Sequence, residues 1–323
     1  MNGGILSAEA AAAVRNAFAG RLQEGASLAG HTSARLGGPA DFLLVVRTAA
    51  ELGQAAETLW AAGVPFRVLG SGSNVLIADA GVREVVVLNE ARDMRFEAEG
   101  PVVWAESGAS LGVVARLVAE RGWSGLEWAG TVPGTVGGAV VGNAGAHGSD
   151  TATCLALAEI LQPGGEVEAW TPERLGYGYR ESWLKRNPGQ SVVISATFRL
   201  GRSEPKAVKA RMAEFVAHRK QTQPPGASMG SMFRNPPGDF AGRLIEAAGL
   251  KGLRMGMAEI SDKHANFFIN RGGATSADVW ALIRAARARV DERFGIQLEL
   301  EIELLGEWDP ATASGRPSGG GVL

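Results

Sequence analysis

The chain has little of several residue types on which particular classes of function depend. Its 323 residues include one cysteine, Cys154, and four histidines. A single cysteine excludes an internal disulfide framework and any metal site built from several cysteines, and it is typical of a reducing compartment. With so few histidines, we assign no metal.

Neither sign of charge is in excess, because 32 Lys and Arg residues stand against 34 Asp and Glu residues. This balance lacks the electrostatic signature of proteins that bind nucleic acid or an anionic membrane. No apolar run approaches the length of a membrane span, and residues 1–18 lack the pattern of a signal peptide. We therefore expect a cytoplasmic protein with no nucleic-acid or membrane partner and no obligatory protein partner.

Hydrophobic residues make up 46% of the chain and charged residues 20%, which is a globular composition. Apolar periodicity and turn residues predict a mixture of helices and strands, and hence an α+β fold. Thr48 and Glu51 form a predicted capping box at the first long helix. The helices are expected over 48–63, 109–121, 204–220, 239–249 and 276–293. The strands are expected near 65–69, 74–78, 84–88, 102–106, 155–161, 166–170, 192–200, 266–270 and 297–305.

The 45 glycines are about twice the usual share, and they gather in two segments. The first is "LGSGSNVLI" (69–77), and the second is "GTVPGTVGGAVVGNAGAHG" (130–148). Each glycine costs backbone entropy and removes packing surface, so this density indicates backbone that something must approach closely. We expect successive turns in the second segment rather than a helix.

Both glycine segments favour a ligand that carries phosphates and a flat ring system. In the first, backbone N–H groups after a strand form an anion-binding concavity. The usual nucleotide fingerprints are absent, because Val75 stands where a dinucleotide motif needs glycine and no P-loop motif occurs. Either segment alone is equally well explained as a tight or bulged turn.

Together with other segments, these loops resemble one family. "HTSARLGGPADFLLV" (31–45), "VLGSGSNVLIADAGVREVVV" (68–87) and "GLEWAGTVPGTVGGAVVGNAGAHG" (125–148) resemble the flavin domain of UDP-N-acetylenolpyruvoylglucosamine reductases, which use the FAD-binding fold of the vanillyl-alcohol oxidase type. The resemblance continues, in the family's order, through "GYGYRES" (176–182), "GSMFRNP" (230–236), "AGRLIEAAGLKGLRMGMAEISDKHANFFIN" (241–270) and "LELEIELLG" (298–306). It therefore covers nearly all of the chain.

The resemblance implies a reaction in two halves. NADPH, the co-substrate, reduces the cofactor FAD, which then reduces UDP-N-acetylglucosamine enolpyruvate to UDP-N-acetylmuramate for peptidoglycan synthesis. It also implies FAD contacts from Arg35, Gly70, Ser71, Gly72, Ser73, Asn74, Val75, Leu76, Thr131, Pro133, Gly134, Gly137, Gly138, Asn143, Ala144, Gly145 and His147. The family more often has tyrosine where His147 stands, so we expect altered stacking on the flavin.

Two residues match the family's principal catalytic groups. Arg180 matches the arginine that holds the substrate carboxylate, which a planar guanidinium can grip with two hydrogen bonds. Ser231 matches the proton donor to the enolate. Taken alone, Arg180 is more typical of a surface ion pair with Glu181, and Ser231 is typical of a turn cap.

Glu301 matches the second acid of the family's site. The family pattern around it runs Leu-Glu-Pro-Glu-Val-Arg, whereas here Leu300 replaces the proline, Ile302 the valine and Glu303 the arginine. Glu301 therefore loses a positively charged neighbour. The alternative interpretation is that the alternating glutamates form a solvated strand face.

The remaining matches concern the substrate and the class of reductase. Arg219, Lys220, Asn235, Lys263 and His264 are candidate substrate-binding residues, although a basic helix end is also favoured by its own dipole. The catalytic arginine and serine are 51 positions apart (231 − 180). This short spacing resembles the shorter class, which lacks a tyrosine-bearing insertion.

The Pro- and Gly-rich stretch after residue 220 indicates a domain boundary. We expect FAD-binding lobes over 1–80 and over 81–219 with 298–310, a substrate lobe over 220–297 and a disordered tail over 311–323. One alternative is another FAD-dependent oxidase or dehydrogenase on the same fold, which would not need the Arg, Ser and Glu together. A second is a non-enzymatic flavin- or nucleotide-binding protein.

Overall fold

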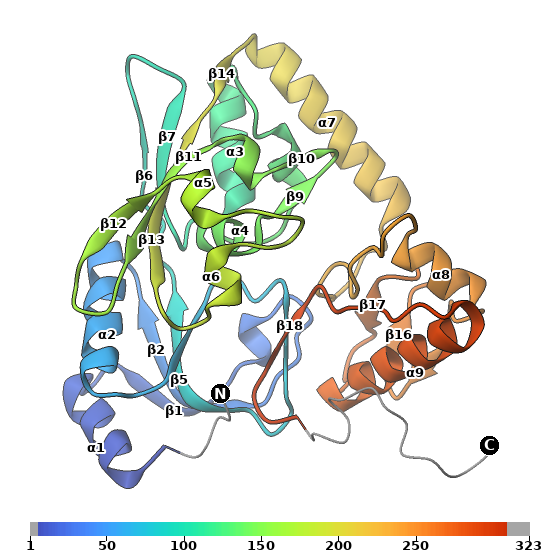
Figure 1. The fold of residues 1–323 in the computed structure, drawn as a ribbon, viewed down its shortest axis with the longest axis horizontal. Coiled ribbons are helices and arrows are strands. Elements are labelled where there is room, and N and C mark those ends of the chain that lie inside the picture. The colour runs from blue at the N-terminus through green and yellow to red at the C-terminus, as the bar shows by residue number, and fades with distance from the viewer. Residues whose placement is uncertain (1–5, 309–323) are drawn as a thin grey trace.

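The computed structural model describes residues 6–308, and its mixture of helices and strands confirms the predicted α+β class. Figure 1 shows a blue N-terminal lobe, a green second lobe and an orange-to-red third lobe, with the yellow helix α7 (Pro205–Thr222) running from the second toward the third. The tail expected over 311–323 lies outside the described residues. Of the helices within 6–308, none has the length and apolarity that crossing a membrane requires.

The first lobe is built on a sheet in which β2, β5 and β3 run parallel and β1 is antiparallel to β2. Helix α2 buries Leu52 and Leu59 in the same core as Phe42. The side chain of Thr48 accepts a hydrogen bond from the Glu51 N–H, which is one half of the predicted capping box, whereas the Glu51 carboxylate accepts from the Arg47 N–H at 2.7 Å. The elements are α1 (Ala8–Ala17), β1 (Leu22–Ser27), β2 (Pro39–Val46), α2 (Ala49–Ala61), β3 (Phe66–Leu69) and β5 (Val82–Asn89).

The second lobe contains an antiparallel sheet in the order β12-β11-β13-β7-β6. Helix α3 packs its apolar face, which includes Leu111, Val114 and Val118, into the core beside Phe198. The elements are β6 (Met94–Phe96), β7 (Val102–Glu106), α3 (Leu111–Glu120), α4 (Val136–Gly142), β11 (Leu155–Leu161), β12 (Val167–Trp170) and β13 (Val192–Arg199). Short elements complete the two lobes: η1 (Ala29–His31), β4 (Val75–Ile77), β8 (Trp123–Ser124), η2 (Glu127–Thr131), β9 (Gly145–Ala146), β10 (Ser149–Asp150), η3 (Thr151–Thr153), α5 (Pro172–Leu175), α6 (Trp183–Arg186) and β14 (Gly201–Arg202).

The third lobe packs two helices with a three-stranded antiparallel sheet. The long helix α9 begins with a capping box between Thr275 and Asp278, and its apolar face joins a core that contains Trp280, Ile283 and Phe268. The elements are α8 (Ala241–Ala247), β15 (Arg254–Met255), β16 (Ala258–Ile260), β17 (Phe268–Asn270) and α9 (Ser276–Phe294).

The expectation of successive turns in the second glycine segment is wrong over Val136–Gly142, which forms helix α4. Thr135 caps this helix by accepting a hydrogen bond from the Gly138 N–H at 3.3 Å. Val136, Ala139 and Val140 lie on one face, spaced i, i+3 and i+4, and are buried in the second-lobe core. Their burial offsets the poor helix propensity of the glycines between them.

The C-terminal strand differs from the prediction in length and in partner. Only Glu303–Leu305 forms a strand, β18, and it pairs in parallel with β4 rather than returning to the second lobe. The alternation of apolar residues specifies which side chains are buried but does not specify the partner strand. Because β5 also pairs with β2 and β3, the first sheet extends beyond the boundary expected at residue 80.

One carboxylate ties the third lobe to the first. Asp79 follows β4 and accepts hydrogen bonds from the N–H groups of Ser276 at 2.8 Å and Ala277 at 2.9 Å, at the start of α9. The Ser276 hydroxyl also donates to the carbonyl of Ile77 at 2.6 Å. A carboxylate at a helix N-terminus satisfies N–H groups that have no partner within the helix and interacts favourably with the helix dipole.

We therefore expect Asp79→Ala to lower the free energy of unfolding by about 1–3 kcal/mol, because two backbone donors lose a charged acceptor. Urea unfolding of the purified protein measures this loss. Glu292→Ala in helix α9 is the control, since the ion pair of Glu292 with Arg289 is exposed, and this substitution should change stability little. Equal effects of the two substitutions would contradict the assigned tether.

Candidate active site

The two glycine segments line one cavity of about 660 Å³, together with residues from all three lobes. Most of the predicted site residues lie on its wall. They are Gly70, Ser71, Gly72, Ser73, Asn74, Val75, Pro133, Gly134, Gly137, Gly138, Ala144, Gly145, Arg180, Arg219, Ser231 and Glu301.

The glycines of this cavity serve two different purposes. A Cβ at Gly70 would lie 2.5 Å from the Thr135 hydroxyl oxygen, so this glycine lets the two loops approach each other. By contrast, a Cβ at Gly138 would meet nothing closer than 3.5 Å, and one at Gly142 nothing within 4 Å. Both lie on the cavity wall, where their missing side chains leave room for a ligand.

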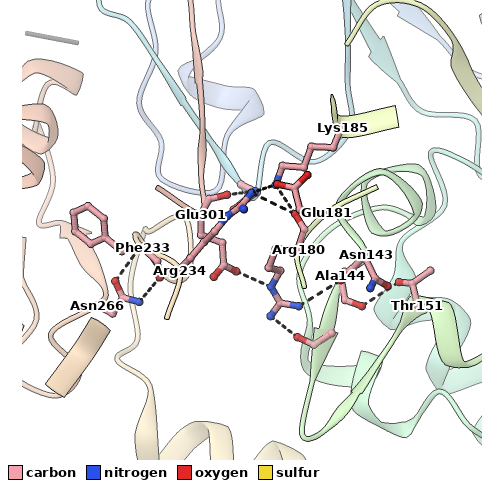
Figure 2. A network of polar contacts seen from close by, with 12 residues as sticks. Asn143, Ala144, Thr151, Arg180, Glu181, Lys185, Phe233, Arg234, Asn266 and Glu301 are labelled. Carbon is pink, nitrogen blue, oxygen red and sulfur yellow. Dashed lines mark hydrogen bonds and ion pairs between the residues drawn. The ribbon is translucent and has the colours of Figure 1, made fainter. Parts of the chain in front are cut away.

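Arg180 is held on several sides, as Figure 2 shows. Its Nε donates to Glu301 Oε1 at 2.9 Å, and its Nη2 donates to the Gly145 carbonyl at 2.7 Å. The side chains of Arg180 and Glu301 are only 23% and 15% exposed, so this is a largely buried ion pair. The alternative pair with Glu181 does not form, because Glu181 accepts instead from Arg234 Nη2 at 2.6 Å.

Glu301 is positioned by its backbone, between the first and third lobes. The side-chain amide of Asn74 donates to the Glu301 carbonyl at 3.1 Å, and the Glu301 N–H donates to the Met232 carbonyl at 3.0 Å. Of the three alternating glutamates, Glu299 is exposed, whereas Glu301 and Glu303 line the cavity. The alternation therefore does not form a uniformly solvated face.

Ser231 lies on a loop fixed by Asn266, a residue that the sequence analysis did not single out. The side chain of Asn266 accepts from the Phe233 N–H at 2.9 Å and donates to the Phe233 carbonyl at 2.8 Å. The Asn266 carbonyl also accepts from the Met232 N–H at 2.8 Å. Asn266 is fully buried, so this clamp holds the backbone around Ser231 in one position.

Comparison with known proteins places most of the chain in the family that the sequence motifs resemble. Residues 221–305 match the family model of the UDP-N-acetylenolpyruvoylglucosamine reductase C-terminal domain, and residues 40–170 match an FAD binding domain. The reductase of Chloroflexus aggregans is 45% identical over 280 residues, which cover 85% of this chain and 94% of that protein. The reductase of Rubrobacter xylanophilus is 46% identical over 86% of this chain and 93% of its own length.

The crystal structure of the UDP-N-acetylenolpyruvylglucosamine reductase from Thermus caldophilus is similar throughout. It superposes with a TM-score of 0.77 at 38% sequence identity, over 88% of this chain and 99% of that one. The chain belongs to the UDP-N-acetylenolpyruvoylglucosamine reductase family. It is therefore an FAD-binding oxidoreductase, which confirms the predicted family, enzyme class and cofactor.

Five residues that the family resemblance implied for FAD do not line the cavity: Arg35, Leu76, Thr131, Asn143 and His147. Leu76 is core, and Arg35 is exposed. Asn143 ends α4 in the left-handed conformation with φ of 42°, and its carbonyl accepts from Arg180 Nη1 at 3.4 Å. Asn143 therefore supports Arg180 through its backbone.

His147 packs on helix α7 instead of facing the cavity. Its ring stacks on Phe215 with centroids 4.2 Å apart, and it makes an edge contact with His218 at 5.6 Å. Burial lowers the pKa of His147, and the nearby charges of His218 and Arg219 lower it further. Stacking of an imidazole on a neighbouring aromatic ring is a packing role that sequence spacing cannot reveal.

Of the five residues expected to bind substrate, only Arg219 lines the cavity, and its guanidinium also donates to the Thr131 carbonyl. Asn235 accepts from the Ala241 N–H at 3.1 Å and so supports the start of α8. The Lys263 ammonium donates to the Lys220 carbonyl at 2.6 Å. Burial lowers the pKa of His264, whose ring packs against Gly242 of α8.

The close contact between the two glycine loops gives a direct test of the cofactor site. Gly70→Ala should weaken FAD binding roughly 5- to 150-fold, because overpacking of this size costs about 1–3 kcal/mol and pushes the loops apart. Titration of the apoprotein with FAD measures the change. Gly30→Ala is the control, since a Cβ there meets nothing within 4 Å and Gly30 lies outside the cavity. Unchanged FAD affinity in Gly70→Ala would contradict the expectation that the two glycine loops bind FAD.

Proposed function

We propose that this protein reduces UDP-N-acetylglucosamine enolpyruvate to UDP-N-acetylmuramate, with NADPH as reductant and bound FAD as carrier, in peptidoglycan precursor synthesis. One observation supports this most strongly: Arg180, Ser231 and Glu301 reach the wall of the same cavity as both glycine loops. Another flavin enzyme on this fold would need the loops but not these three residues together.

The proposed reaction creates negative charge beside the substrate carboxylate. Addition of hydride to the terminal carbon of the enolpyruvyl group leaves an enolate spread over the adjacent carbon and the carboxylate. We assign Arg180 the role of stabilising that negative charge. Because Glu301 and two backbone carbonyls hold its guanidinium in place, little reorganisation is needed when the charge develops.

Ser231 is the proposed proton donor to the enolate carbon. A serine hydroxyl is a weak acid, but an enolate carbon is basic enough to take its proton. The Asn266 clamp on the adjacent backbone supports this role, since a donor must be held in a fixed position to act. Glu301 is assigned to orient Arg180 and to polarise the carboxylate.

FAD, when bound, supplies the redox chemistry, and the protein supplies binding and electrostatics. The glycine-lined walls at 70–75 and 133–145 are the proposed contacts for its diphosphate and ring system. Arg219 is the proposed contact for the diphosphate of the sugar nucleotide, because it alone of the five candidates lines the cavity. The first two lobes would then enclose FAD, and the third lobe would bind the sugar-nucleotide substrate beside it. We expect the reaction to take place in the cytoplasm.

The experiment is an anaerobic titration of the FAD-loaded protein with NADPH. The yellow colour should bleach, and it should return when UDP-N-acetylglucosamine enolpyruvate is added. Rapid reoxidation by oxygen, without any response to the sugar nucleotide, would instead support a different FAD-dependent oxidase or dehydrogenase.

Ser231→Ala separates the two halves of this reaction. The variant should still bleach with NADPH, but its reoxidation by the sugar nucleotide should slow by about 10²- to 10⁴-fold, which is the usual contribution of a positioned general acid. Stopped-flow absorbance of the flavin measures both steps. Ser228→Ala, in the same loop but off the cavity wall, should behave as the parent protein. Normal recovery of colour in Ser231→Ala would show that another group donates the proton.

A further inference from the structure

A lysine that the sequence analysis did not select lies on the wall of the same cavity. Lys185 belongs to the short helix α6 (Trp183–Arg186), which Ser182 caps. The Ser182 hydroxyl accepts from the Lys185 N–H at 3.1 Å and donates to the Val141 carbonyl at 2.6 Å. These bonds fix α6 against α4, so the base of the lysine side chain has a defined position beside the glycine-rich wall.

The Lys185 ammonium binds the main chain of the catalytic arginine. Its Nζ donates to the Arg180 carbonyl at 3.1 Å, and Arg234 Nη2 reaches the same oxygen at 3.5 Å (Figure 2). Arg180 has a φ of 57°, in the left-handed region that costs a non-glycine residue of order 1–3 kcal/mol. Two cations therefore stabilise the strained peptide that places the Arg180 guanidinium.

Lys185 also brings a positive charge to the cavity. Burial lowers the pKa of its ammonium and Arg234 lowers it further, whereas Glu303, Glu181 and Glu301 raise it. Within residues 6–308 this ammonium makes no ion pair. The bond to Arg180 uses one of its three N–H donors, which leaves two for an acceptor inside the cavity.

We propose that Lys185 is a further functional residue of this reductase: its positive charge stabilises negative charge that appears in the cavity during turnover, while its bond to Arg180 positions that residue. The inference rests on the proposed function. Reduction of bound FAD and formation of the substrate enolate each add negative charge to this space, and a fixed cation there favours both. In this role the ammonium acts through its charge and transfers no proton.

Three variants separate charge from the hydrogen bond to Arg180. Lys185→Met removes both, Lys185→Gln keeps a donor without charge, and Lys185→Arg keeps charge and donors. We expect the midpoint potential of the bound flavin to become more negative in the Met and Gln variants and to remain close to the parent value in the Arg variant. With substrate, kcat should fall roughly tenfold or more in the first two, with most of the activity kept by Lys185→Arg. Lys206→Met removes one exposed lysine charge at the start of α7 and should change neither quantity.

The potential is measured by dye equilibration of the FAD-loaded protein, without any sugar nucleotide, and thermal melting is recorded alongside. This arm therefore reports on Lys185 even if the protein reduces a different substrate. An unchanged potential and kcat in Lys185→Met would overturn the proposal. So would a Gln variant indistinguishable from the parent, or a lower melting temperature with no change in potential, because either result would reduce Lys185 to a structural clamp.

Discussion

The ion pair between Arg180 and Glu301 joins two segments that are 121 residues apart in the sequence. Both side chains are mostly shielded from water, so each charge depends on the other and on the surrounding carbonyl groups. Arg180 comes from the loop before α6 in the second lobe. Glu301 comes from the segment that leads into β18, between the first and third lobes. Because the backbone of Glu301 is also bonded to Asn74 of the first lobe and Met232 of the third, the pair connects all three lobes at one point of the cavity.

The scaffold around this pair consists mainly of backbone contacts. Asn74 makes two hydrogen bonds to the segment that contains Glu301. The Asn74 side chain donates to the Glu301 carbonyl, and the Asn74 carbonyl accepts from the Glu303 N–H at 2.9 Å. Asn266 gives the neighbouring serine loop a similar support. Neither amide needs to touch a substrate for its loss to matter, because a catalytic group displaced by even 1 Å loses much of its effect. Glycine has the complementary role, since it allows the loops of the first and second lobes to approach each other.

Much of the fold and of the site could be predicted from the sequence. Apolar spacing predicted α3 and α9, and glycine clustering predicted the cavity wall, because both depend on local chemistry. Helix α4 was missed because buried valines outweighed the glycines that argued against a helix. The partner of β18 was missed because alternation carries no information about the neighbouring strand. The role of Asn266 was missed and that of His147 was misassigned for a third reason, since both side chains contact residues distant in the chain. Lys185 was missed although its contacts with Ser182 and Arg180 are local, because they depend on the left-handed backbone of Arg180.

The position of β18 has a consequence for the order in which the site is completed during synthesis. This strand is added beside β4, although more than two hundred residues separate the two segments. A ribosome that has made the first two lobes has already produced both glycine loops and Arg180, but not Glu301, which pairs with it. The first glycine loop then still lacks the strand that pairs with β4. The cavity is therefore complete only after the last segment to be synthesised has paired with one of the first.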